Sequence, residues 1–279
     1  MRAVGGRLWK AGLSVAVLAA ALIYVFRVRP DDVPSQILLG AMSLVFVLAA
    51  LRYMINVEGR RPLRMLPFSI LFWLATWLVE AVLIRVGLPG GRYSYGTALL
   101  ARIRIGTVPV IVPTLWTAFG WMASSIAGAI GRSPAAGRER TGKVKPSSAR
   151  YRELLRNGFR AGLVFVSVAF AVEWHFSRTA GFWTWKAVDP RFSVDGVPIA
   201  NFILWFAVGF LSVILGSIVQ APPIRDGDAA PFYRRLPVYG LCALLVAGAV
   251  MNFTQGIVVG GSGCILGLAF WGGFIVRKR

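Results

Sequence analysis

Two carboxylic acids lie inside long apolar runs, where an ionisable side chain is costly and is by default a functional candidate. Glu80 lies in the run WLVEAV, and Glu173 lies in the run AVEWH. Apolar surroundings disfavour the carboxylate anion, so such an acid persists as a neutral proton donor near neutral pH. In the alternative, structural interpretation, Glu80 pairs with Arg85 or Arg92, and Glu173 pairs with Arg178.

Aromatic and polar residues cluster just after each acid. The segment GLPGGRYSYG combines glycines that allow tight turns with two tyrosines, and an extended GFWTW segment would place its two tryptophans on one face. Later in the chain, Asn201 and Trp205 are four residues apart and therefore share a helix face. These residues are Tyr93, Tyr95, Trp183, Trp185, Asn201 and Trp205. Alternatively, the aromatic residues form an interfacial belt and the asparagine caps a helix.

A proton donor beside aromatic faces suits one kind of chemistry, the protonation of an alkene to a tertiary carbocation. Aromatic faces stabilise a nearby cation, and a water held by Asn or Tyr could then capture it. The substrate would have to be an isoprenoid dissolved in the membrane.

The composition indicates the surroundings in which these residues work. Of 279 residues, 57% are hydrophobic and 15% are charged, against roughly 25% charged in an average soluble protein, and the mean hydropathy is +0.66. These values exclude a soluble globular enzyme, a disordered chain and a disulfide scaffold. The net charge of +20 lies in short clusters between apolar runs, which is typical of a membrane protein rather than of a nucleic-acid-binding one.

Known cofactor and metal motifs are missing from the sequence. One histidine and two separated cysteines, Cys242 and Cys264, cannot build a typical zinc site. Both cysteines lie in apolar runs and are interpreted as buried hydrophobes. The sequence has no nucleophile elbow, phosphate loop or dinucleotide fingerprint. We therefore expect no metal, and any cofactor is either absent or held by a motif that the sequence does not reveal.

The apolar runs predict an all-α, polytopic membrane bundle of about eight helices, since a helix needs about 20 apolar residues to cross a bilayer. The expected spans are Leu8–Phe26, Ser35–Ile55, Leu66–Val86, Gly106–Ile130, Gly158–Phe176, Ile199–Gln220, Leu236–Phe253 and Gly256–Val276. The first is interpreted as a retained helix rather than a signal peptide, and the last two as a tight hairpin. We expect one membrane domain, residues 1–279, with four spans in 1–131, a linker in 132–157 and four spans in 158–279.

The basic residues predict the orientation of this bundle. With the N-terminus inside, 22 of the 31 Lys and Arg residues fall on inner segments, as expected for cytoplasmic loops. Both termini should then be cytoplasmic, in a multi-pass protein of the cell (inner or plasma) membrane, and both acids should lie in the outer half of the bilayer. The Arg132–Arg156 segment is rich in Gly, Pro, Ser and Arg, and we expect a flexible cytoplasmic linker whose charges set the topology near anionic lipid, rather than a specific partner site.

The two motif blocks resemble a known family. The first runs from Glu80 through GGRYSYG and Val108-Pro109 to Trp116, and the second runs from Glu173 through GFWTW and GVPIANF to Trp205. Together they resemble the bacterial and archaeal carotenoid biosynthesis membrane proteins, typified by bisanhydrobacterioruberin hydratase, over roughly Leu66 to Gln220. Where the family pattern has Asp-containing segments before its tryptophan block, this chain has Glu173-Trp174-His175.

The resemblance implies a hydro-lyase that needs no cofactor and adds water across the terminal double bond of an acyclic carotenoid end group. Its partners would be the carotenoid, the lipid bilayer and other carotenoid biosynthesis enzymes, and no nucleic acid. Two alternatives remain open: a non-catalytic isoprenoid carrier or transporter, and an isoprenoid double-bond isomerase. The candidate catalytic residues are Glu80, Glu173, Tyr93, Tyr95 and Asn201, and the candidate substrate-binding residues are Trp77, Arg92, Trp116, His175, Trp183, Trp185 and Trp205.

Overall fold

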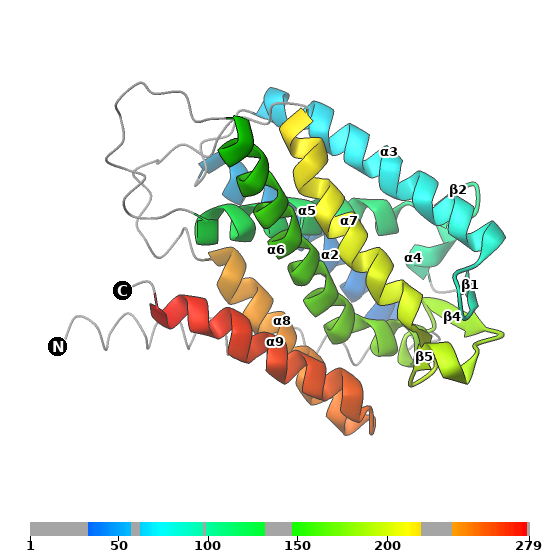
Figure 1. Ribbon diagram of the computed structural model, residues 1–279. Coiled ribbons are helices and arrows are strands. Elements are labelled where there is room, and N and C mark those ends of the chain that lie inside the picture. Colours follow the sequence, from blue (N-terminus) through cyan, green and yellow to red (C-terminus); the bar gives the residue numbers. More distant parts are fainter. Residues whose placement is uncertain (1–32, 57–61, 97–98, 132–146, 219–235, 278–279) are drawn as a thin grey trace.

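The computed structural model describes residues 33–56, 62–96, 99–131, 147–218 and 236–277, and it is dominated by long helices (Figure 1). The long helices are α2 (Val33–Asn56), α3 (Pro62–Val86), α5 (Ile111–Gly131), α6 (Ser147–Trp174), α7 (Ile199–Ile218), α8 (Leu236–Thr254) and α9 (Val258–Arg277). Seven of the eight expected spans therefore correspond to helices in the described part of the chain. The first, Leu8–Phe26, lies outside it.

Among the residues that the structure describes, four helical segments are long and apolar enough to cross a membrane: Met65–Val86, Tyr151–Thr179, Ile199–Ser217 and Leu236–Thr254. Helix α3 shows how such a helix divides its surface. Phe68, Phe72 and Glu80 face inward and are buried, whereas Leu74 and Leu78 on the opposite face are about half exposed, at 50% and 57%. An outward face of large aliphatic side chains is expected where the surroundings are lipid rather than water.

Two expected boundaries were wrong. The fourth span was expected from Gly106, but Gly106 lies in the turn of a short hairpin between β2 (Arg104–Ile105) and β3 (Val108–Pro109), and the helix begins only at Ile111. Helix α6 begins at Ser147, inside the expected flexible linker. The linker's second part is rich in Ala, Arg, Glu and Leu, which favour helix over an irregular chain.

The helices pack closely through small residues, as is usual for helices in membranes. Gly162 of α6 lies against the ring of Phe206 of α7, and Gly209 of α7 lies against Phe165 of α6. The α8–α9 connection is a tight turn at Gly256, which has a φ of +73°, and the amide of Ile257 donates to the Asn252 carbonyl over 2.8 Å. This is the hairpin expected from the sequence.

Short strands gather at one end of the bundle, where α3 and α6 end and α5 and α7 begin (Figure 1). Strand β1 (Arg92–Tyr95) follows α3, and β4 (Trp183–Lys186) follows α6. The two pair in antiparallel fashion although about 90 residues separate them. A second hairpin, β5 (Ser193–Val194) with β6 (Val197–Pro198), leads directly into α7. These connections place the segments that carry the candidate residues next to one another.

Candidate active site

The β1–β4 ribbon directs four aromatic side chains to one face. Tyr93 lies opposite Trp185, and Tyr95 lies opposite Trp183. Because successive side chains of a strand alternate between faces, the two tyrosines and two tryptophans share the face that covers the helix ends. The sequence predicted this alternation for the tryptophans, and the ribbon gives the tyrosines the same arrangement.

Glu80, near the end of α3, accepts two hydrogen bonds from tyrosines of β1. The hydroxyl groups of Tyr93 and Tyr95 both donate to Oε2 of Glu80, the second over 2.9 Å. Glu80 is 4% exposed. Burial, and after it the neighbouring Glu80 carboxyl group, raises the pKa of Tyr93 and of Tyr95 well above the ordinary tyrosine value. Both hydroxyl groups therefore stay protonated and available as donors.

Glu173, near the end of α6, accepts its hydrogen bonds from the tryptophans of β4. The indole Nε1 atoms of Trp183 and Trp185 both donate to Oε1 of Glu173, each over 2.8 Å. Glu173 is 1% exposed. Directly after it, helix α6 widens into a π-helical turn, η2 (His175–Thr179), and such turns often occur at functional sites.

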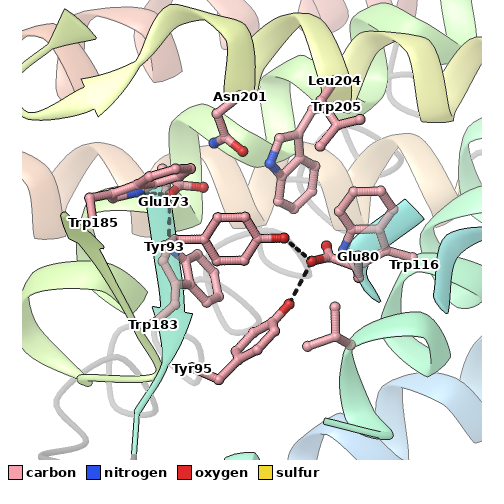
Figure 2. A pocket seen from close by; sticks show the side chains of 11 residues that line it. Glu80, Tyr93, Tyr95, Trp116, Glu173, Trp183, Trp185, Asn201, Leu204 and Trp205 are labelled. Atoms are coloured by element: carbon pink, nitrogen blue, oxygen red, sulfur yellow. Dashed lines mark hydrogen bonds between the residues drawn. The ribbon is translucent and has the colours of Figure 1, made fainter. Parts of the chain in front are cut away.

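Both acids line a single cavity of about 40 Å³, with aromatic walls contributed by α5 and α7 (Figure 2). The rings of Trp116 on α5 and Trp205 on α7 lie 5.1 Å apart and form one wall. The complete lining is Glu80, Tyr93, Tyr95, Val112, Trp116, Glu173, Trp183, Trp185, Asn201, Leu204 and Trp205.

Asn201 reaches the cavity because a tight turn fixes the start of α7. The turn residues Asp195 and Gly196 have φ values of +47° and +74°, a combination typical of a two-residue hairpin turn. The Asp195 carbonyl accepts hydrogen bonds from the Trp174 indole, over 3.2 Å, and from Arg178. This turn is therefore tied to the end of α6, and Asn201 follows two residues inside α7 rather than capping it.

Neither acid forms the ion pair considered from the sequence. Arg85 and Arg92 are exposed, whereas Glu80 is buried with its tyrosine partners. Arg178 donates to the Asp195 carbonyl. Among the described residues, the donors to both carboxyl groups are therefore neutral hydroxyl and indole groups, and that leaves both acids available for chemistry.

Nine of the twelve candidate residues line the cavity, and Trp77, Arg92 and His175 do not. Trp77 donates to the Ile105 carbonyl over 3.1 Å. Arg92 alternates to the exposed face of β1. His175 follows Glu173 by two residues, which turns it to roughly the opposite side of the helix, where it is buried.

Two lining residues, Val112 and Leu204, were not predicted from the sequence. Val112 lies one helical turn before Trp116, and Leu204 lies three residues after Asn201, so helical spacing from a candidate residue was the available signal. Both are aliphatic residues in apolar helices, and their residue type alone does not indicate a functional site.

Comparison with known proteins adds a family assignment. A family model described as "Carotenoid biosynthesis protein" matches residues 36–270, which is most of the chain and includes every residue of the cavity. No curated protein and no solved structure matches the chain.

Proposed function

Because the chain belongs to the carotenoid biosynthesis protein family, we propose that it is an integral-membrane hydratase acting on an acyclic carotenoid. The enzyme would add water across the terminal double bond of the end group and give a tertiary alcohol. The proposal includes a multi-pass arrangement in the cell membrane with both termini cytoplasmic, which the charge distribution supports.

The observation that carries this proposal is the placement of two buried acids in one aromatic cavity, without an ion pair to either among the described residues. A buried carboxyl group can protonate an alkene, and the faces of Trp116 and Trp205 can stabilise the tertiary carbocation that results. General acid catalysis of this kind contributes typically 10²–10⁴-fold to a rate. The cavity residues themselves supply each part of this chemistry.

Expression of the protein in bacteria that accumulate lycopene, followed by liquid chromatography and mass spectrometry of the pigments, tests the proposal. The same membranes are also supplied with a panel of other acyclic carotenoids. The expected product is more polar than its substrate and heavier by one water. If no acyclic carotenoid gains water, or if the enzyme only moves double bonds, the hydratase proposal is overturned.

Substitutions test whether the two acids are responsible. Glu80→Gln and Glu173→Gln keep the shape of the side chain but remove the carboxyl group, so each should reduce hydration by at least 10²-fold. Glu153→Gln on α6 is the matched control, because it makes the same chemical change about 20 residues, or roughly 30 Å of helix, from Glu173. Hydration that persists in both cavity variants at equal membrane abundance would mean that the acids are structural.

A further inference from the structure

We propose that Asn201 and Glu173 together bind the water molecule that is added, and that Glu80 supplies the proton from the other end of the cavity. This division of roles rests on the hydratase activity proposed above. It assigns separate functions to two acids that the sequence left equivalent.

Asn201 presents a buried donor that forms no hydrogen bond of normal geometry with the described residues. The residue is 6% exposed, and its Nδ2 atom lies near the Glu173 carboxyl group without forming a hydrogen bond of normal geometry with any residue that the structure describes. Figure 2 shows the side chain directed into the cavity, with its amide nitrogen on the side of Glu173. A buried donor without a well-placed acceptor is unfavourable, so its presence in a cavity indicates a ligand that accepts.

Glu173 presents the complementary acceptor. Both indole N–H groups donate to Oε1, which leaves Oε2 for another partner. An indole can donate but cannot accept, so the two tryptophans suit a carboxylate that takes up a proton. A water molecule accepts from Asn201 and donates to Glu173, and the 40 Å³ cavity exceeds the ~10–15 Å³ that a water needs.

Glu80 lies at the other end of the lining, beside Trp116, with the Tyr93 ring between the two acids (Figure 2). Its partners are hydroxyl groups, which can both donate and accept. They can therefore remain hydrogen-bonded to Glu80 before and after it gives up a proton. The wall formed by Trp116 and Trp205 is also on this side, where a cation would form.

The reaction proceeds by protonation of the alkene and then capture of the cation by water. The O–H bond of Glu80 breaks, and its electron pair stays on the Glu80 carboxylate. The π bond of the alkene breaks and its electron pair forms a C–H bond to the proton at the alkene carbon that carries hydrogen, which leaves a cation on the tertiary carbon. The oxygen of the bound water forms the C–O bond and releases one proton to Glu173. Return of that proton to Glu80 through solvent completes the cycle, and the net change is the addition of one water.

Deuterium oxide separates the two roles, because protonation and water capture leave different labels. In Asn201→Leu, an isosteric change, hydration should fall about 10- to 100-fold. Glu80 should still protonate the alkene in this variant, and a cation that meets no water loses a proton again. Deuterium should therefore enter the recovered, unhydrated substrate. In Glu80→Gln, hydration and deuterium incorporation should both be lost.

Controls separate this inference from the proposed function. Asn157→Leu on α6 makes the same change outside the cavity and should hydrate normally, while Asn201→Ser, which keeps a donor, should hydrate better than Asn201→Leu. Normal hydration by Asn201→Leu, or loss of hydration and deuterium incorporation together at equal membrane abundance, overturns the water site. Failure of the unaltered protein to hydrate any carotenoid overturns the hydratase itself.

Discussion

Tyr93 and Trp185 lie directly opposite each other in the β1–β4 ribbon, with ring centroids 5.1 Å apart, yet they donate to different acids. The hydroxyl group of Tyr93 donates to Glu80, and the indole of Trp185 donates to Glu173. One pair of strands therefore holds both carboxyl groups. Any shift in the register of the ribbon would disturb both ends of the cavity at once.

Substitution of Gly96 tests this dependence on register. A Cβ atom at Gly96 would lie 2.0 Å from the Gly181 carbonyl oxygen, at the point where the Gly96 amide donates to the Phe182 carbonyl over 2.9 Å. Gly96→Ala should therefore force the strands apart and destabilise the protein by about 1–3 kcal/mol, with loss of hydration. Thermal unfolding in detergent measures the effect.

Gly240→Ala on α8 is the control for this change, because no described atom outside the neighbouring backbone of the same helix lies within 4 Å of the added Cβ. Alanine is favoured over glycine in a helix by about 1 kcal/mol, so this variant should keep or gain stability. A Gly96→Ala variant that is as stable as Gly240→Ala would show that the close approach of the two strands is dispensable.

The two cavity tyrosines should resist ionisation at high pH. Burial and the neighbouring Glu80 raise the pKa of Tyr93 and Tyr95, so both should stay protonated when ordinary tyrosines ionise near pH 10. Because the folded state holds these protons more tightly, their contribution to stability is complete below pH 10 and is lost as the pH rises further. The change in absorbance near 295 nm follows this titration.

The double variant Tyr93→Phe/Tyr95→Phe identifies which tyrosines are resistant. The chain has seven tyrosines, and the variant should lose absorbance only from the late part of the titration. If the early part shrinks instead, the two hydroxyl groups are accessible to solvent and the hydrogen bonds to Glu80 are wrong.

Two substitutions at Trp183 separate the donor from the aromatic face. Trp183→Phe keeps a ring but removes the N–H donor to Glu173, and hydrogen bonds to charged groups are worth about 1.5–3 kcal/mol, so hydration should fall by about 10- to 150-fold. Trp183→Leu also removes the face, which should add a further loss of about 2- to 30-fold. The initial hydration rate in isolated membranes measures both.

Trp73 provides the matched control, because its indole donates to the Thr114 hydroxyl over 3.1 Å outside the cavity. Trp73→Phe should leave the hydration rate close to that of the unaltered protein. Equal rates for Trp183→Phe and the unaltered protein would mean that the indole donor to Glu173 does not contribute to the reaction.

The orientation in the membrane gives a further prediction. The expected inner segments hold 22 of the 31 basic residues, so the C-terminus should be cytoplasmic. A reporter that works only in the cytoplasm should therefore be active when it is fused after Arg279, and a reporter that works only in the periplasm should be inactive. A periplasmic signal would invert the arrangement and place the cavity in the inner half of the bilayer.

The sequence by itself determined the approximate positions of the seven long helices in the described residues and the acidic and aromatic residue types that line the cavity. Apolar runs of sufficient length specify helices whatever their neighbours, because a helix satisfies its own backbone hydrogen bonds. Glu80 and Glu173 were identifiable because an acid in such a run is unfavourable unless it has partners. The motifs that carry the family resemblance begin at these same two residues.

Only the tertiary structure decided which residues meet. The pairing of β1 with β4 joins segments about 90 residues apart, and its register depends on helix packing that no local pattern encodes. In that register the tyrosines donate to Glu80 and the tryptophans donate to Glu173, while Arg92 lies on the exposed face of the ribbon. Helical rotation likewise removes Trp77 and His175 from the cavity and brings in Val112 and Leu204. Residue type follows from the sequence, but the direction of a side chain depends on how the whole chain packs.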